Sequence, residues 1–134
     1  SLLAGGREID LKVTTKIPAD ADIVLADEVQ LEQVLINLFR NASEASRHAD
    51  RKEIRVVSQR MADQRVSISV RDFASGLKGG EEGLFEIGSQ GSRGGLGFGL
   101  PLSRTLVEAN GGTLTASNAA GGGAEFRLVL DCPD

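Results

Sequence analysis

The sequence predicts an α+β fold, a two-layer sandwich in which helices cover a mixed sheet. Two observations on periodicity lead to this prediction. Apolar residues alternate with polar ones in several short segments, as in strands, and recur at helical spacing in two longer segments. A third observation is that strand and helix segments do not alternate regularly, as they would in a parallel α/β fold. A length of 134 residues with 40% hydrophobic residues fits one domain over residues 1–134.

The first elements are predicted from a change in apolar period. Ile9, Leu11 and Val13 alternate with polar residues, which indicates a half-buried strand, and residues 23–25 suggest a short second strand. From Asp27, a suitable N-cap, the period becomes helical. A helix of about five turns follows. Its apolar stripe consists of Leu31, Val34, Leu35, Leu38, Ala42 and Ala45.

The middle of the chain predicts a hairpin followed by a glycine-rich loop. Residues 54–57 and 66–70 have strand character and are joined through residues 62–64. Ten of the 17 glycines lie between Gly76 and Gly99, so we expect a mobile loop there.

The last third predicts one helix and two strands. The helix runs from about Leu100 to Asn110, where Gly111 suits the left-handed position that ends a helix. Strands are expected at residues 113–117 and 125–130, joined by a turn through residues 121–123.

Composition excludes some classes of function. The net charge is -4, and the chain has no Trp, no Tyr and five Phe, so it lacks the basic, aromatic character of a nucleic-acid binder. The single cysteine, Cys132, suggests a reducing compartment. No apolar run approaches the ~18 residues that span a membrane. Because the sequence opens on Ser1 rather than Met, we interpret it as a fragment of a longer protein.

Two amides on the first helix form the first candidate cluster. Asn37 and Asn41, four residues apart, project from nearly the same side of the helix. Their oxygens could bind Mg²⁺, which takes few protein ligands and completes its shell with water and phosphates. From spacing alone, the favoured alternative is that both amides hydrogen-bond neighbouring loops.

The second cluster follows a predicted strand. Asp72 could accept a hydrogen bond from an exocyclic amine such as that of adenine, and Gly76 would allow backbone to approach a ligand. Taken alone, this segment is better explained as a plain turn in which the Asp bonds its own backbone.

The third cluster precedes the second helix. Gly95, Gly97 and Gly99 lead into Leu100 and Pro101, with no capping side chain at the helix start. Open N–H groups approached by glycines make an anion site, although a glycine triplet is weak evidence by itself. Together the clusters supply a cation ligand, an adenine acceptor and a phosphate loop, the three requirements of Mg·ATP.

In this order the clusters resemble the N, G1, F and G2 boxes of sensor histidine kinase catalytic domains, within the GHKL ATPase superfamily. Residues 33–45 resemble the N box, 72–76 the G1 box, 84–86 the F box and 95–100 the G2 box. The resemblance implies a mixed five-stranded sheet backed by three helices, with a flexible ATP lid. It implies ATP binding by Asn41, Asp72, Gly76, Leu77, Leu84, Phe85, Gly95, Leu96, Gly97, Phe98, Gly99 and Leu100.

The resemblance also implies the catalytic groups. Asn41, helped by Asn37, would hold Mg²⁺, and Arg93 or Arg40 would neutralise charge on the transferred phosphoryl group. ATPase and serine kinase relatives typically place a Glu where this chain has Asn37, and an amide cannot act as a general base. Asn37 therefore favours the histidine kinase branch.

The chain departs from the family pattern at several positions. Ala74 replaces the first glycine of the G1 box, residues 87–89 read Ile-Gly-Ser after the F-box Phe, and Arg93 stands in for a lid lysine. Because of these departures, one alternative is that the chain is a degenerate nucleotide-binding module of the same fold. A second alternative is a GHKL ATPase or serine kinase.

The implied partners lie outside the chain. The acceptor would be a histidine on a dimerisation domain of the parent protein, with a response regulator downstream. His48, the only histidine, is explained as a surface residue near a helix end. We expect an isolated domain that is monomeric, a homodimeric parent, no nucleic-acid partner, and a cytoplasmic location, including as the cytoplasmic part of a membrane-anchored sensor.

Overall fold

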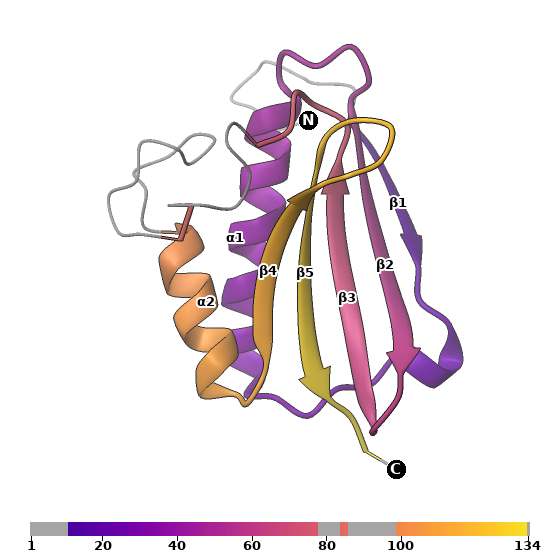
Figure 1. Ribbon diagram of the computed structural model, residues 1–134, viewed down its shortest axis with the longest axis vertical. Coiled ribbons are helices and arrows are strands. Elements are labelled where there is room, and N and C mark those ends of the chain that lie inside the picture. Colours follow the sequence, from indigo (N-terminus) through magenta and orange to yellow (C-terminus); the bar gives the residue numbers. More distant parts are fainter. Residues whose placement is uncertain (1–10, 78–83, 86–98, 134) are drawn as a thin grey trace.

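A mixed five-stranded sheet carries two α-helices on one face in the computed structural model, which describes residues 11–77, 84–85 and 99–133 (Figure 1). The strands are β1 (Lys12–Lys16), β2 (Glu53–Met61), β3 (Arg65–Asp72), β4 (Thr113–Asn118) and β5 (Ala124–Asp131). The helices are α1 (Glu28–Ser46), α2 (Gly99–Ala109) and the one-turn 3-10 helix η2 (Ala19–Ala21).

The strand order is β1-β2-β3-β5-β4, with β1 parallel to β2 and all other neighbours antiparallel. Asp63 and Gln64 adopt positive φ in the turn between β2 and β3, which confirms the predicted hairpin. Gly121, Gly122 and Gly123 adopt positive φ in the turn between β4 and β5. The predicted α+β sandwich with a mixed five-stranded sheet is confirmed.

The core lies between the sheet and the helices because both present apolar residues at their natural periods. Alternate residues of β5, namely Ala124, Phe126, Leu128 and Leu130, are at most 1% exposed. Opposite them, α1 buries Val34, Leu38 and Ala42. The side chain of Asp27 accepts a hydrogen bond from Gln30 N and caps α1, as the sequence predicts.

The prediction of a strand at residues 23–25 is wrong. This segment is a connection between η2 and α1, tied to the sheet by one hydrogen bond from Leu25 N to Asp131 O. Ile23 and Leu25 are 60% and 53% exposed, so their apolar character reflects no buried strand face.

The first predicted strand is confirmed as β1, with Ile9 outside the described residues. Val13 pairs with the fully buried Ile54, and parallel partners share a face of the sheet. Even so, Val13 is 46% exposed, because β1 is the edge strand on the side away from the helices (Figure 1).

The described residues contain two α-helices and η2, close to the three helices that the resemblance implies. Gly111 ends α2 with a φ of 79°, as predicted. The segment expected to form a lid falls mostly outside the described residues.

Candidate functional site

Three elements far apart in the sequence bring the predicted site residues together: α1, the carboxyl end of β3 and the first turn of α2 (Figure 1). One buried apolar cluster contains residues from or beside each element, among them Leu38, Val70, Leu77, Leu84 and Leu100. Of the predicted nucleotide-binding leucines, Leu77, Leu84 and Leu100 therefore converge, and their side chains belong to the core rather than to an open surface. Leu96 lies outside the described residues.

Asp72 is the most buried of the polar site residues that the structure describes, with 1% of its surface exposed. Alternation along β3 turns it to the helix-covered face, together with Val66 and Val70. Its Oδ1 accepts hydrogen bonds from the backbone N–H groups of Ala74 (3.0 Å) and Ala124 (3.2 Å). The two bonds fix the orientation of the carboxylate at the end of the strand.

The residues after Asp72 form a loop held by β4. Gly76 adopts a φ of 85°, a conformation that favours glycine. Leu77 N donates to Asn118 Oδ1 at 2.7 Å, and Asn118 Nδ2 donates to Leu77 O at 3.3 Å. Sequence reasoning missed Asn118, because no local pattern links residues 41 apart in the chain.

The two amides of α1 have different surroundings. Asn41 is buried, with 8% of its surface exposed, whereas Asn37 is half-buried. Asn37 Nδ2 donates to Ser103 Oγ (3.1 Å) and to Gly99 O (3.4 Å), and its Oδ1 accepts from Gln33 Nε2 (3.0 Å). Asn37 thus joins α1 to the first turn of α2 by hydrogen bonds, as in the alternative explanation given for this amide in the sequence analysis. A role for Asn37 in binding Mg²⁺ stays a prediction.

The start of α2 is only partly described. Gly99 is its first residue, Leu100 and Pro101 are buried, and a Cβ on Gly99 would lie 3.8 Å from the Asn37 amide carbon. Arg93, Gly95, Leu96, Gly97 and Phe98 were predicted from sequence and lie outside the described residues.

Phe85 packs on the edge of the core beside this site. Its ring meets that of Phe126 edge-on, with 6.5 Å between the centroids, and the Arg104 guanidinium lies 4.6 Å from its centroid. Leu84, its neighbour, is 3% exposed.

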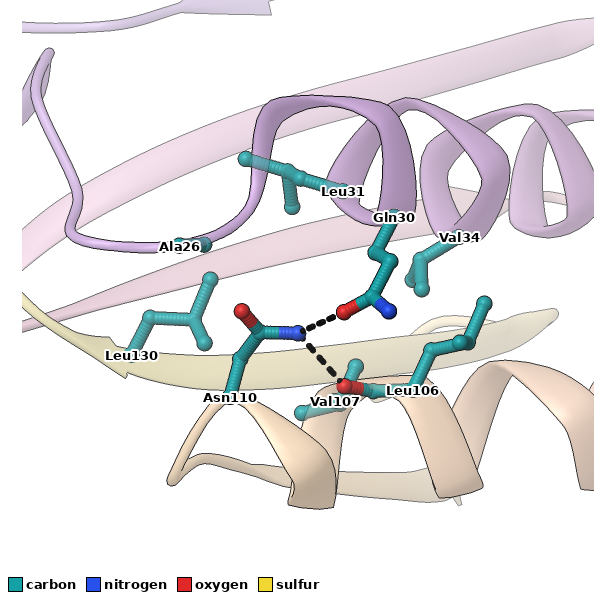
Figure 2. Close-up of a pocket in the computed structure, with 8 residues that line it drawn as sticks. All are labelled: Ala26, Gln30, Leu31, Val34, Leu106, Val107, Asn110 and Leu130. Carbon is teal, nitrogen blue, oxygen red and sulfur yellow. Dashed lines mark hydrogen bonds between the residues drawn. The ribbon is translucent and has the colours of Figure 1, made fainter.

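A small crevice lies at the opposite end of the helix pair, between the start of α1 and the end of α2 (Figure 2). Its volume of about 10 Å³ has room for no more than about one water molecule. Asn110 enters from α2 and donates to Gln30 Oε1 and Leu106 O, each at 2.8 Å (Figure 2). The crevice is therefore a packing junction and not a ligand site.

Comparison with known proteins shows the family to which the chain belongs. A family model described as histidine kinase-, DNA gyrase B-, and HSP90-like ATPase matches residues 26–134. The sensor protein FixL of Bradyrhizobium diazoefficiens is 41% identical over 133 residues, which cover 98% of this chain and 26% of that protein. The chain thus spans about a quarter of the length of that relative.

Solved structures show the same fold. The mycobacterial sensor histidine kinase MprB matches with a TM-score of 0.78 at 19% identity, over 92% of this chain and 83% of that chain. Full-length ShkA, in complex with AMPPNP, matches with a TM-score of 0.76 at 25% identity, over 92% of this chain and 26% of that chain.

The mixed five-stranded sheet with α-helices on one face matches the fold of histidine kinase catalytic domains, within the GHKL superfamily. The chain belongs to the histidine kinase-, DNA gyrase B- and HSP90-like ATPase family, as a catalytic and ATP-binding domain of the sensor histidine kinase type. Neither described α-helix has the combined length and apolar character needed to cross a lipid bilayer.

Proposed function

We propose that this domain binds Mg·ATP and transfers the γ-phosphoryl group to a histidine on a separate dimerisation domain of its parent sensor kinase. The observation that carries the proposal is the buried carboxylate of Asp72, oriented by the N–H groups of Ala74 and Ala124. A buried carboxylate in a fixed orientation is suited to accept a hydrogen bond from the exocyclic amine of adenine.

One relative supports the choice of nucleotide. ShkA, 25% identical to this chain, is described in complex with AMPPNP, an ATP analogue. In our proposal the adenine lies against Asp72 and the loop through Gly76 and Leu77. The side chains of Leu84 and Leu100 contribute the apolar wall behind it, since both belong to the same buried cluster as Leu77.

The donor set of α1 fits a magnesium ion. Asn41 offers an amide oxygen, a hard ligand of the kind that Mg²⁺ takes in small numbers while phosphates and water complete its shell. Asn37 would assist, either as a second ligand or by holding α2 through Gly99 and Ser103. Bound Mg²⁺ would neutralise phosphate charge during transfer.

The phosphates would lie at the start of α2. There the phosphates would meet the backbone N–H groups of Gly95, Leu96, Gly97, Phe98 and Gly99. The negative charge that develops during transfer would be balanced by Arg93 or Arg40. Arg93, Gly95, Leu96, Gly97 and Phe98 enter the proposal on sequence alone.

The acceptor must come from outside the domain. His48 is the only histidine of the chain, and it lies exposed just beyond the end of α1. In the proposed reaction an external imidazole nitrogen forms a bond to the γ-phosphorus while the bond to the β–γ bridging oxygen breaks, and ADP leaves. Positioning and charge stabilisation would supply most of the catalysis. A response regulator would then receive the phosphoryl group.

The alternatives are less well supported. An ATPase or serine kinase would need a general base, and Asn37 offers an amide already bonded to Gln33 and Ser103. The degenerate module was motivated by Ala74 and by the atypical residues 87–89 after the F-box Phe, which lie outside the described residues. Ala74 is not among the residues with positive φ, and its N–H donates to Asp72, so alanine fits this loop without backbone strain.

Two measurements test the proposal. Calorimetry should show that the unaltered domain binds AMPPNP and that Mg²⁺ strengthens this binding. In Asn41→Ala, Mg²⁺ should no longer strengthen the binding, whereas binding of AMPPNP without metal should remain. Adding a phosphoacceptor helical domain with γ-labelled ATP should then label its histidine. No heat on mixing with AMPPNP and Mg²⁺ would refute nucleotide binding, and binding without labelling would favour the regulatory module. We place the domain in the cytoplasm and its parent in a homodimer.

A further inference from the structure

We propose that the β4–β5 hairpin positions the adenine site, and that Asn118 at the end of β4 is its key positioning residue. This inference rests on the proposed function, because it assigns a role relative to the adenine carboxylate of Asp72. Asn118 would touch no part of the nucleotide. It would act on the loop 72–77, which carries that carboxylate and the wall of the site.

The Asn118 side chain bonds both backbone groups of a single loop residue, Leu77. Its amide accepts from Leu77 N at 2.7 Å and donates to Leu77 O at 3.3 Å, so one side chain satisfies both backbone groups of a residue that is 7% exposed. Leu77 lies beyond the end of β3 and has left the ladder between β3 and β5. The Asn118 side chain replaces the strand partner that Leu77 lacks.

Gly76 fits closely against the Asn118 side chain. A Cβ at this position would lie 2.6 Å from Asn118 Oδ1, and the φ of 85° is unfavourable for other residues. Gly76 was predicted to let backbone approach a ligand, but the neighbour observed this close is Asn118. The loop and the end of β4 are therefore matched in shape.

The hairpin also holds Asp72 itself. Ala124 N donates to Asp72 Oδ1 at 3.2 Å. A Cβ on Gly123 would overlap the carbonyl oxygen of Asp72, so the backbone of Gly123 packs directly against the backbone of Asp72. The start of the loop is held by β5 and its end by β4.

Arg71 secures the hairpin from the other face of the sheet. Its Nη2 donates to the carbonyl oxygens of Ala120 and Gly122, each at 3.0 Å. The Phe73 ring supports it, with 4.2 Å between the ring centroid and the guanidinium carbon. Because successive strand residues point to opposite faces, Arg71 and Asp72 bond the β4–β5 hairpin from opposite faces of the sheet.

These contacts connect the position of the carboxylate to a hairpin with no nucleotide-binding role of its own. Loss of the Asn118 bonds should let the loop shift, which would change the distance between the adenine amine and Asp72. Phosphate and metal contacts come from α1 and α2 and should be unaffected. The expected defect is therefore in recognition of the base.

The test measures affinities for ATP and GTP by calorimetry at fixed Mg²⁺. Guanine presents an oxygen where adenine presents its amine, so the ratio of the two affinities reports the placement of Asp72. For Asn118→Ala we expect ATP affinity to fall about 3–10-fold, as for loss of one or two net hydrogen bonds. The GTP affinity should stay within about twofold, so the ATP:GTP ratio falls by nearly the same factor as the ATP affinity.

Three controls separate positioning from general stability. Asn118→Asp keeps the acceptor for Leu77 N and should retain most of the discrimination. Ser117→Ala alters the exposed neighbouring position of β4 and should leave both affinities unchanged. Leu114→Ala removes core volume from the same strand, so it should lower the melting temperature and keep the ATP:GTP ratio.

The outcomes are distinct. A lower melting temperature for Asn118→Ala with an unchanged ATP:GTP ratio would overturn the positioning role and leave Asn118 a structural residue. An equal loss of ATP and GTP affinity would also overturn it. If the unaltered domain bound neither nucleotide, the proposed function would fail instead.

Discussion

At the scale of the residue, Asp72 shows how two interpretations of one side chain can both hold. The sequence favoured a turn in which the carboxylate bonds its own backbone, and the bond from Ala74 N to Oδ1 is of this kind. The structure adds a bond from Ala124, 52 residues away, and nearly complete burial. A simple turn requires neither, and both suit a carboxylate held ready for a ligand.

Replacing Asp72 with Asn should weaken ATP binding. The amide can present its NH₂ group where the carboxylate accepted, so we expect a loss of about 1.5–3 kcal/mol, or roughly 10–150-fold in affinity by calorimetry. Asp131→Asn, an exposed position on β5, should bind ATP like the unaltered domain. Equal affinity in Asp72→Asn would remove Asp72 from the adenine site.

Glu53 is a second buried carboxylate, at the start of β2 where this strand pairs with β1. Burial acts to raise the pKa of Glu53, but hydrogen bonds from Arg51 and Thr14 and the charges of Arg51 and Arg55 outweigh it. The pKa is therefore lowered from its ordinary value of 4.5. Thr14 lies on β1 and Arg55 on β2, so the ionised carboxylate links the two strands.

This shift predicts a dependence of stability on pH. A lowered pKa in the folded state means that ionised Glu53 stabilises the fold above its ordinary pKa, and that this stabilisation is lost as pH falls through the folded value. Urea denaturation should show Glu53→Gln less stable than the unaltered domain at neutral pH, with the difference shrinking below about pH 4.5. Glu32→Gln, exposed on α1, serves as the control. A difference that does not change with pH would contradict the assignment.

At the scale of the element, the pairing of α1 with α2 depends on amides at both ends of the contact. Asn37 bonds the first turn of α2 at one end. At the other, Asn110 Oδ1 accepts from Asp27 N at 2.8 Å, and its Nδ2 bonds Gln30 and Leu106 (Figure 2). These amides fix how the helix that carries Asn41 sits against the helix that begins at the glycine loop.

Removing the Asn110 amide should therefore destabilise the domain. Asn110→Ala loses three hydrogen bonds at this junction, for which we expect a decrease of about 1–3 kcal/mol in the free energy of unfolding. Gln30→Ala loses the bond to Asn110 alone and should cost less than about 1 kcal/mol. Chemical denaturation measures both, and equal costs would mean that the bonds to Asp27 and Leu106 contribute little.

At the scale of the whole molecule, one of the two edge strands of the described sheet, β1, discourages pairing with another chain. β1 has five residues, with exposed lysines Lys12 and Lys16 at its ends. Charged residues on a short edge strand oppose edge-to-edge association. We expect dimerisation of the parent to depend on other helices, as proposed above.

Sedimentation should accordingly show a single species with the mass of one chain, and that mass should not change across the micromolar range. Lys12→Val with Lys16→Val, which removes the edge charges, should increase self-association. A stable dimer of the unaltered domain would contradict this expectation and indicate an interface within residues 1–134.

The elements were predictable where local patterns dominate. The Asp27 cap and the apolar stripe placed α1, and Gly111 placed the end of α2. The strand predicted at residues 23–25 was wrong because a run of three apolar residues is too short to show the period that distinguishes a strand from a connection. Asn37 and Asp72 were identified by residue type, and the turn interpretation of Asp72 included a local backbone bond such as that from Ala74 N. Their distant partners, Ser103 and Ala124, were not predicted.

The sequence by itself determined the two α-helices, the hairpin of β2 and β3, the last two strands and their order, because these depend on neighbours within a few positions. It also suggested the residues whose chemistry suits Mg·ATP. The tertiary structure alone decided that Asn118 holds Leu77, that Ala124 orients Asp72 and that Asn37 meets Ser103, pairs 41, 52 and 66 residues apart. Such pairs form only when strands and helices pack together, and a one-dimensional pattern of residues does not encode their distance.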